Sequence, residues 1–301
     1  MNPSSFPLPA AERQRSSAFR TLTALARAHP GRLAVTLGLV ALENVLMLAY
    51  PLFAGFAVDA ILRGDTAHAL WYAVVVLAFW LVGAARRAVD TRTFTRLYAE
   101  LAVGVVLAQR QQAQSTSTAA ARVVLAREFV DFFEHHVPAI ATALVSMAGA
   151  AVMLLVLEWK VGAACVTALL SCLAWVPAFA RRNEALHQRI NNRLEQEVAL
   201  VETVGPAALR RHYTVLSSLR IWLSDREASA YLAIGALAAL LFGLLIALLA
   251  ATPGIRAGHV SAVMTYLWTF VMSLNEAPGV VDQLARLRDI GRRVAPIDVE
   301  R

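Results

Sequence analysis

RRNEALHQRINNRLEQEVALVETVGPAALRRHYTVLSSLRIWLSDRE, residues 181–227, is the stretch that decides the fold of this chain. It contains eight Arg and six Asp or Glu among its 47 residues, and its one strong helix breaker is Gly205-Pro206 near the middle. Long uncharged apolar runs lie on both sides of it. At 1.5 Å rise per residue, each half would form a helix of roughly 33 Å. We therefore predict a long charged helical hairpin between two membrane-spanning helices.

The composition indicates a membrane protein with several spans. Hydrophobic residues make up 58% of the chain and charged residues 16%, against about 45–50% and about 25% in soluble domains. Cys165 and Cys172 lie seven residues apart in one apolar run. That spacing is roughly 10 Å along a helix, too far for a disulfide. We interpret both as small buried apolar side chains.

The net charge of +7 is explained by its distribution. Of the 28 Lys and Arg residues, only Arg63, Lys160 and Arg256 fall on one side of the predicted topology, and the other 25 fall on the opposite side. Positive residues concentrate on the cytoplasmic side of membrane proteins. We therefore predict a multi-pass protein of a bacterial inner membrane with both termini in the cytoplasm. A nucleic-acid partner is not needed to explain the charge.

Apolar runs of membrane length predict the helices. We expect six transmembrane helices, at about residues 33–58, 69–88, 137–157, 161–180, 229–251 and 257–276. The turns between them on the outer side are short, whereas the inner connections, 86–136 and 181–227, are long. The predicted fold class is therefore an all-α membrane protein with six helices, extended into the cytoplasm as two long helical hairpins.

The remaining segments flank this helical domain, which we place at residues 33–294. Residues 1–17 are polar and Pro-rich and predict a flexible tail without a cleaved targeting signal. Residues 18–32 have apolar and Arg positions at helical spacing, which indicates an amphipathic helix in the membrane interface, stopped by Pro30-Gly31. Residues 295–301 form the predicted C-terminal tail.

Several local sequences, in this order, resemble the six-helix transmembrane domain of ABC exporters. YPLFAGFAVDAILRGD, residues 50–65, resembles the Pro-containing end of that family's first helix. AGHVSAVMTYLWTFVMSLNEAPGVVDQLARLRDIGRRV, residues 257–294, resembles its sixth helix. The resemblance extends over about 18–294 and is closest to stand-alone membrane units without a fused nucleotide-binding domain. It implies a domain-swapped homodimer with a central substrate cavity.

The same resemblance implies that the two hairpin tips dock on an ATPase. The residues expected at these coupling tips are Ser115, Thr116, Ser117, Thr118 and Arg122 in the first hairpin, and Glu202, Gly205, Pro206, Arg210 and Arg211 in the second.

The chain departs from the pattern of a complete ABC transporter in one respect. A P-loop requires Gly-x4-Gly-Lys-Ser/Thr to hold phosphate. The chain contains one lysine, Lys160, which follows Trp159 in a predicted outer turn, and no LSGGQ-like sequence. We therefore expect no enzyme activity and no cofactor in this chain. ATP and magnesium would act only through a separate ATPase subunit, unless transport uses another energy source.

Polar and aromatic residues inside the spans are candidates for the substrate cavity or for proton coupling. A carboxylate in mid-helix costs on the order of 2.5–3.5 kcal/mol on insertion scales, so it usually faces a cavity or a partner. Glu43 is therefore either functional or paired with a polar group such as Asn44 or a residue of another helix. The full candidate set is Glu43, Asn44, Trp80, Trp175, Tyr266, Asn275 and Glu276. For the aromatic residues the alternative is packing, and for Asn275 and Glu276 it is the end of a helix that leaves the bilayer.

No metal site is predicted. Asp131 and His135 stand four residues apart, a spacing that can bind metal. They lie where a helix enters the bilayer, however, which is a usual place for charged and His side chains.

Three functions follow from these features. The first is the permease subunit of an ABC-type transporter, with export favoured and ATP hydrolysis supplied by a separate subunit. The second is a proton-driven peptide or solute transporter of the SbmA/BacA kind, which resembles the same scaffold and relies on membrane glutamates. The third is a membrane assembly or regulatory subunit that does not transport.

Overall fold

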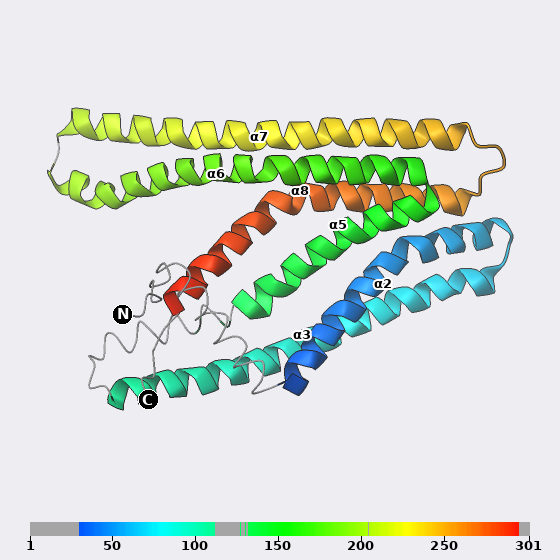
Figure 1. Ribbon diagram of the computed structural model, residues 1–301, viewed down its shortest axis with the longest axis horizontal. Helices are drawn as coiled ribbons and strands as arrows, with labels where there is room; N and C mark the ends of the chain where they lie inside the picture. The colour runs from blue at the N-terminus through cyan, green and yellow to red at the C-terminus, as the bar shows by residue number, and fades with distance from the viewer. Residues whose placement is uncertain (1–29, 112–126, 128–129, 131, 204, 295–301) are drawn as a thin grey trace, which may run out of the picture. The chain divides into compact units, whose positions relative to one another are not determined.

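Long helices make up nearly all of the described chain. The computed structural model describes residues 30–111, 127, 130, 132–203 and 205–294. In chain order the helices are Pro30–Leu62 (α2), Thr66–Gln111 (α3), the short π-helix Phe132–His136 (η1), Val137–Leu157 (α5), Trp159–Thr203 (α6), Pro206–Ala250 (α7) and Ala257–Val294 (α8). Figure 1 shows them in sequence colours. These described ranges contain no strand, and the predicted all-α class is confirmed.

Five of these helices contain a stretch long and apolar enough to cross a membrane: α2, α3, α5 together with the end of η1, α7 and α8. In α6 the described apolar part is shorter, Trp159–Trp175, and corresponds to the predicted span at 161–180. The helix then continues without a break into the charged segment. Most helices are longer than the spans we predicted, because a helix can pass from lipid into water without a change of backbone geometry.

Several predictions concern residues outside the described ranges. They are the tail at 1–17, the interfacial helix at 18–32 up to residue 29, the C-terminal tail at 295–301, Asp131, and the first hairpin tip with Ser115, Thr116, Ser117, Thr118 and Arg122. Pro30 begins α2, where we expected it to end the preceding helix. Proline suits the first turn of a helix, since its missing N–H would have no partner there.

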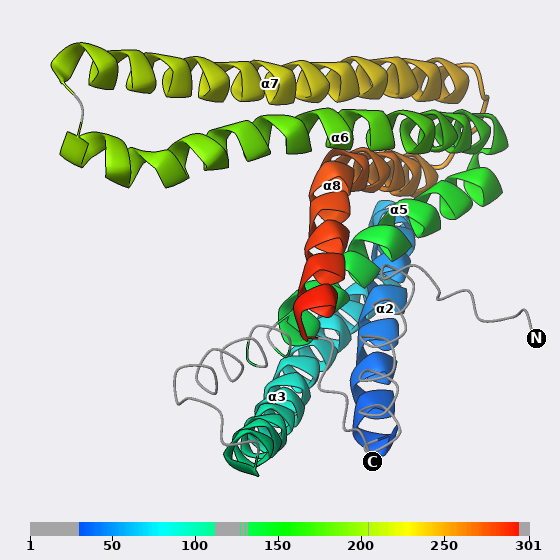
Figure 2. The same cartoon turned by 60° about the vertical axis from the view of Figure 1, so that its left-hand side comes forward.

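The chain divides into two compact units, residues 1–146 with 280–301 and residues 147–279. In the first unit, α2 and α3 form an antiparallel pair, visible side by side in Figures 1 and 2. The turn between them depends on Gly64, whose φ is +76°, a left-handed conformation that costs glycine little. A small apolar cluster brings Phe94 and Leu97 of α3 together with Val130.

Asp65 in this turn caps the start of α3. The backbone N–H of His68 donates to Asp65 Oδ1 at 3.2 Å, which satisfies one of the free donors at a helix N-terminus. His68 Nδ1 lies 2.6 Å from the other carboxylate oxygen. The backbone hydrogen bond from His68 is the main reason that the pKa of Asp65 is lowered from its usual value. The cap explains why α3 begins directly after this residue.

In the second unit, α6 and α7 form the predicted second hairpin (Figure 2). The unit's core is built on one face of α8, where Val263, Tyr266, Phe270 and Leu274 are almost completely buried. Their three- and four-residue spacing is that of a single helix face. Leu154 of α5, Val161 and Cys165 of α6, and Leu245 of α7 are equally buried. Burial of Cys165 agrees with its interpretation as an apolar side chain.

The connection between α5 and α6 is a single residue, Glu158, and it depends on Gly162. The backbone N–H of Gly162 donates to the carbonyl of Glu158 at 2.9 Å. A Cβ atom at Gly162 would lie 2.3 Å from the backbone nitrogen of Leu155. Because that neighbour is backbone, it cannot move aside as a flexible side chain could. The sequence Glu-Trp-Lys-Val-Gly therefore lets α6 return directly beside α5.

We predict that Gly162→Ala destabilises the protein by about 1–3 kcal/mol, the usual cost of overpacking. The measurement is thermal unfolding of the purified chain in detergent. Gly235→Ala is the matched control, since Gly235 is also in a helix, α7, and a Cβ there meets nothing within 4 Å. Equal stability of the two variants would show that the α5–α6 turn tolerates a side chain at residue 162.

Candidate functional site

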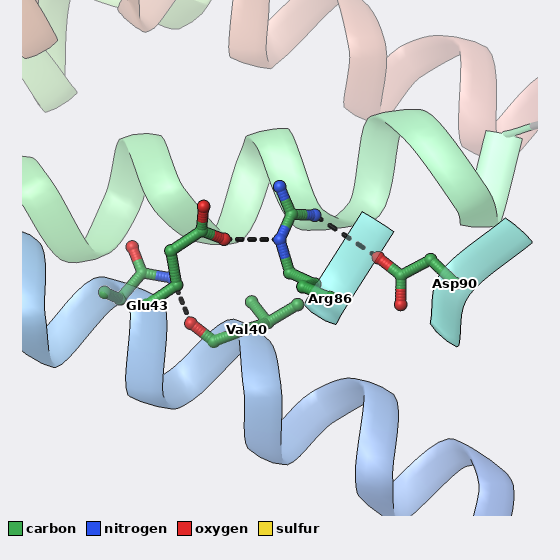
Figure 3. Close-up of polar contacts among 5 residues, drawn as sticks. Val40, Glu43, Arg86 and Asp90 are labelled. Atoms are coloured by element: carbon green, nitrogen blue, oxygen red, sulfur yellow. Dashed lines mark hydrogen bonds and ion pairs between the residues drawn. The ribbon is translucent and has the colours of Figure 1, made fainter. Parts of the chain in front are cut away.

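An ion-pair network joins α2 to α3 in the first unit (Figure 3). The guanidinium of Arg86 on α3 pairs through Nε with the carboxylate of Glu43 on α2. Arg86 Nη1 also donates to Oδ2 of Asp90 at 3.3 Å. The side chains of Glu43, Arg86 and Asp90 are 17%, 19% and 5% exposed. One buried cation therefore serves two carboxylates.

Local helix geometry brings these three groups together. Arg86 and Asp90 are four residues apart on α3, so their side chains lie on the same helix face. Gly83, one turn earlier, leaves room for the glutamate, because a Cβ there would be 3.1 Å from Glu43 Oε1. The antiparallel course of α2 then places Glu43 opposite this face. The contact links two helices that are separate in sequence.

Several buried polar atoms around the network have no hydrogen-bond partner of good geometry. Asn44 Nδ2 donates to the carbonyl of Val40 at 2.8 Å, but Asn44 Oδ1 has no partner. Among the described residues, Thr36 Oγ1 and Asp90 Oδ1 are also buried without a hydrogen-bond partner. Unsatisfied buried polar atoms are few in native proteins and usually have a specific reason. With both carboxylates ionised, Glu43, Arg86 and Asp90 would together carry a net charge of −1.

The sequence identified only part of this site. Glu43 and Asn44 were predicted from their position in an apolar run. For Glu43 the alternatives were a functional role or a pair with another polar group. The structure shows Glu43 paired with Arg86 of another helix. Arg86 was interpreted only as an anchor at the inner membrane face, and Asp90 was not considered. The four-residue spacing of Arg86 and Asp90, directly after an apolar run, is the signal that could have indicated them.

The aromatic candidates lie in different surroundings. Trp80 on α3 is 62% exposed and Tyr266 on α8 is fully buried in the core of the second unit. Trp175 on α6 stacks on Phe179, with ring centroids 4.7 Å apart. Packing therefore accounts for Tyr266, whereas Trp175 is 47% exposed despite its contact with Phe179.

The polar pair at residues 275–276 lies on α8, about five turns beyond its start. Glu276 is exposed and Asn275 is half-buried. Both lie close to the end of the apolar stretch, which runs to Ala277. Their position therefore agrees with a helix that leaves the bilayer.

The tip of the α6–α7 hairpin presents the predicted coupling residues. Glu202 lies in the last turn of α6. Gly205 has an extended backbone, φ −72° and ψ 165°, and precedes Pro206 at the start of α7. Arg210 and Arg211 follow in the next turns and are exposed. The tip thus offers positive charge at the far end of a helical hairpin.

Specific contacts hold the two arms of this hairpin together. Near the tip, the Tyr213 hydroxyl donates to Glu197 Oε1 at 2.6 Å. Farther along, Arg226 Nε donates to Asn183 Oδ1 at 3.1 Å, and its guanidinium lies 5.2 Å from the ring centroid of Phe179. A cation over an aromatic face is attracted by the ring quadrupole. With these contacts, a displacement of one arm would be transmitted to the other.

A third polar contact lies at the opposite end of the second unit. His259 Nε2, near the start of α8, is 3.0 Å from Glu158 Oε1 in the α5–α6 turn. It ties α8 to that turn. Among the residues that the structure describes, no group of three or more His, Cys, Asp or Glu is arranged to hold a metal ion.

Comparison with known families identifies the scaffold. The family model described as the ABC transporter transmembrane region matches residues 22–258, from before α2 to the first residues of α8. The match includes the α2–α3 network and the whole α6–α7 hairpin. A search of curated proteins found no match.

We predict that Arg86→Gln lowers the free energy of unfolding by about 3–5 kcal/mol, because it leaves two buried carboxylates without their cation. The measurement is thermal or denaturant unfolding of the purified chain. The triple variant Glu43→Gln, Arg86→Gln and Asp90→Asn should lose much less, since it leaves no buried charge. Arg87→Gln is the control, because Arg87 is exposed beside Arg86. Equal losses in the Arg86 and Arg87 variants would contradict an energetic role for the network.

Proposed function

This chain belongs to the ABC transporter transmembrane region family, and from that premise we propose that it is a permease subunit powered by a separate ATPase. As a membrane component of an ABC-type transporter it forms part of a path through the bilayer. Our proposal adds that it moves a solute outward across a bacterial inner membrane. ATP and magnesium would be bound by the partner subunit only.

The α6–α7 hairpin is the observation on which this proposal depends. Each helix has 45 residues and is about 68 Å long at 1.5 Å per residue, more than twice the roughly 30 Å of a bilayer core. The helices cross from apolar to charged sequence without interruption. A rigid element of this kind can transmit movement between a soluble partner and the membrane-embedded helices.

The absence of a nucleotide-binding motif in these 301 residues supports a separate ATPase. The one lysine, Lys160, directly follows Trp159 at the start of α6, so it is not the lysine of a phosphate-binding loop. We propose the exposed tip with Gly205, Pro206, Arg210 and Arg211 as the docking point of the ATPase on the second hairpin. Exposed Arg residues suit a partner surface that carries carboxylates.

The orientation and oligomeric state are part of the same proposal. The concentration of Arg on the hairpin side supports cytoplasmic termini by the positive-inside bias. Six helices form half of the transport path in this architecture, so we propose a homodimer. The substrate cavity would lie between the two copies.

Proton-driven transport through Glu43 is less well supported. Glu43 is paired with Arg86 of the neighbouring helix, so its carboxylate is already engaged in a contact within the chain. The ion pair therefore favours a structural role for Glu43. A purely regulatory role for the chain would require no ATPase at the hairpin tip, and the experiment below distinguishes these functions.

We predict that the double variant Arg210→Glu and Arg211→Glu abolishes the ATPase activity that co-purifies with the tagged chain from its native membranes. Charge reversal at the tip would repel the docking surface of the partner. The measurement is phosphate release by the detergent-solubilised complex, together with the ratio of the two proteins.

Arg220→Glu is the control, because Arg220 is an exposed residue of α7 about three turns from the tip. Arg220→Glu and Glu43→Gln should both keep the co-purifying activity. Two results would contradict the proposal: a wild-type chain that purifies without any ATPase, or equal activity in the tip and control variants.

A further inference from the structure

The charges of the α2–α3 network do not balance. Glu43 and Asp90 contribute two negative charges, and Arg86 contributes one positive charge. Glu134 of η1 also acts electrostatically on Asp90 with the same negative sign. An uncompensated buried charge is strongly unfavourable. One positive charge is therefore missing from this group of residues.

Asp90 is the residue at which the missing charge is needed. Glu43 has the closer contact with Arg86, through Nε, whereas Asp90 holds only Nη1, at 3.3 Å through Oδ2. Its other oxygen, Oδ1, is buried and has no hydrogen-bond partner among the described residues. In Figure 3 that oxygen points away from Arg86. This half of the carboxylate thus has no well-formed hydrogen bond and no cation of its own.

The surroundings provide acceptors rather than cations. The Thr36 hydroxyl of α2 is directed at the Asp90 carboxylate, but it forms no hydrogen bond of good geometry there, and a neutral hydroxyl supplies no positive charge. The titratable groups that face Asp90 are Glu43 from α2, through Arg86, and Glu134 from η1. His135 and His136 follow on η1, and each of them takes part in an interaction. Asp90 and Thr36 are 4% and 3% exposed.

The burial of Asp90 Oδ1 restricts which positively charged species can reach it. Asp90 Oδ1 is closed off from water by protein atoms, so a hydrated ion or an amine has no access to it without displacement of α2 from α3. A proton needs no space. We infer that Asp90 is a proton-binding site, occupied in the native protein, that neutralises the α2–α3 network.

The step is a simple protonation. The carboxylate of Asp90 binds one proton on Oδ1, and an O–H bond forms without change of any other bond. The net charge of Glu43, Arg86 and Asp90 then becomes zero. The new hydroxyl is a donor beside Thr36 Oγ1, so both atoms that lacked a partner can be satisfied by a small rotation. Release of the proton would restore the repulsion between Asp90 and Glu134.

This inference does not depend on the proposed function. Its test uses the purified full-length chain in lipid nanodiscs, without nucleotide, ATPase or solute. Infrared spectroscopy detects the carbonyl stretching band of a protonated carboxylic acid, at higher frequency than carboxylate bands. We expect such a band at neutral pH, and we expect it to be absent from Asp90→Asn. Asp59→Asn is the matched control, because Asp59 is a second buried aspartate, on α2, and it should keep the band.

A second measurement identifies the group if Asp90→Asn does not fold. Aspartate labelled with carbon-13 should shift the wild-type band to lower frequency, and Thr36→Val should shift it by removing the hydrogen-bond acceptor beside Asp90. The proposal is overturned if the wild-type band is missing, or if it remains in folded Asp90→Asn. It is also overturned if the band is unaffected by both the label and Thr36→Val. A gain in thermal stability from ammonium or potassium at constant pH, lost in Asp90→Asn or Thr36→Val, would instead identify a larger cation.

Discussion

Backbone hydrogen bonding in a medium without water is the constraint on which this structure depends. In the hydrocarbon core, every N–H and C=O must find its partner within the protein, and a continuous helix achieves this within a single segment. The described chain follows that constraint for most of its length, from α2 to α8. Its described breaks are brief: the turns at Gly64 and Gly254, both with a left-handed backbone, Glu158 alone between α5 and α6, and the residues before Pro206. Each lies where a helix reverses direction.

The same constraint explains how the chain can connect membrane and cytoplasm. A helix that has satisfied its own backbone does not need to end at the membrane surface, so α6 and α7 continue into charged sequence. Outside the lipid, side-chain contacts hold these two helices together. Tyr213 with Glu197 and Arg226 with Asn183 link the arms of the hairpin. This is the physical basis for assigning the hairpin to communication with a soluble partner.

The charged groups between α2 and α3 are costly because they lie close to apolar sequence. Within the apolar region, a carboxylate is tolerated only with a partner, and Arg86 has to serve both Glu43 and Asp90. Replacing such a network entirely can be nearly neutral, whereas removing one member is costly. The presence of this ion-pair network is therefore weak evidence that it stabilises the folded protein. Its excess of acceptors is more informative, because it indicates a site that is complete only when a further positive charge is present.

The sequence by itself determined the class of protein, most helix positions and the second hairpin. Apolar run length, Arg distribution and the Gly205-Pro206 break are local properties, and local hydrogen bonding decides whether a helix forms. The sequence also singled out Glu43, because a lone carboxylate in an apolar run is visible without a structure. It did not predict that Pro30 would begin α2 instead of ending a preceding helix.

Only the tertiary structure decided which groups meet. The pairing of Glu43 with Arg86 depends on the antiparallel register of α2 and α3, and no local pattern specifies that register. The sequence made Tyr266 a candidate for the substrate cavity, but packing on one face of α8 buries its side chain completely. Asp90 shows why the difference matters. In the sequence it is one charge beyond the end of an apolar run, and only the arrangement of α2, α3 and η1 around it leaves one of its oxygens without a partner.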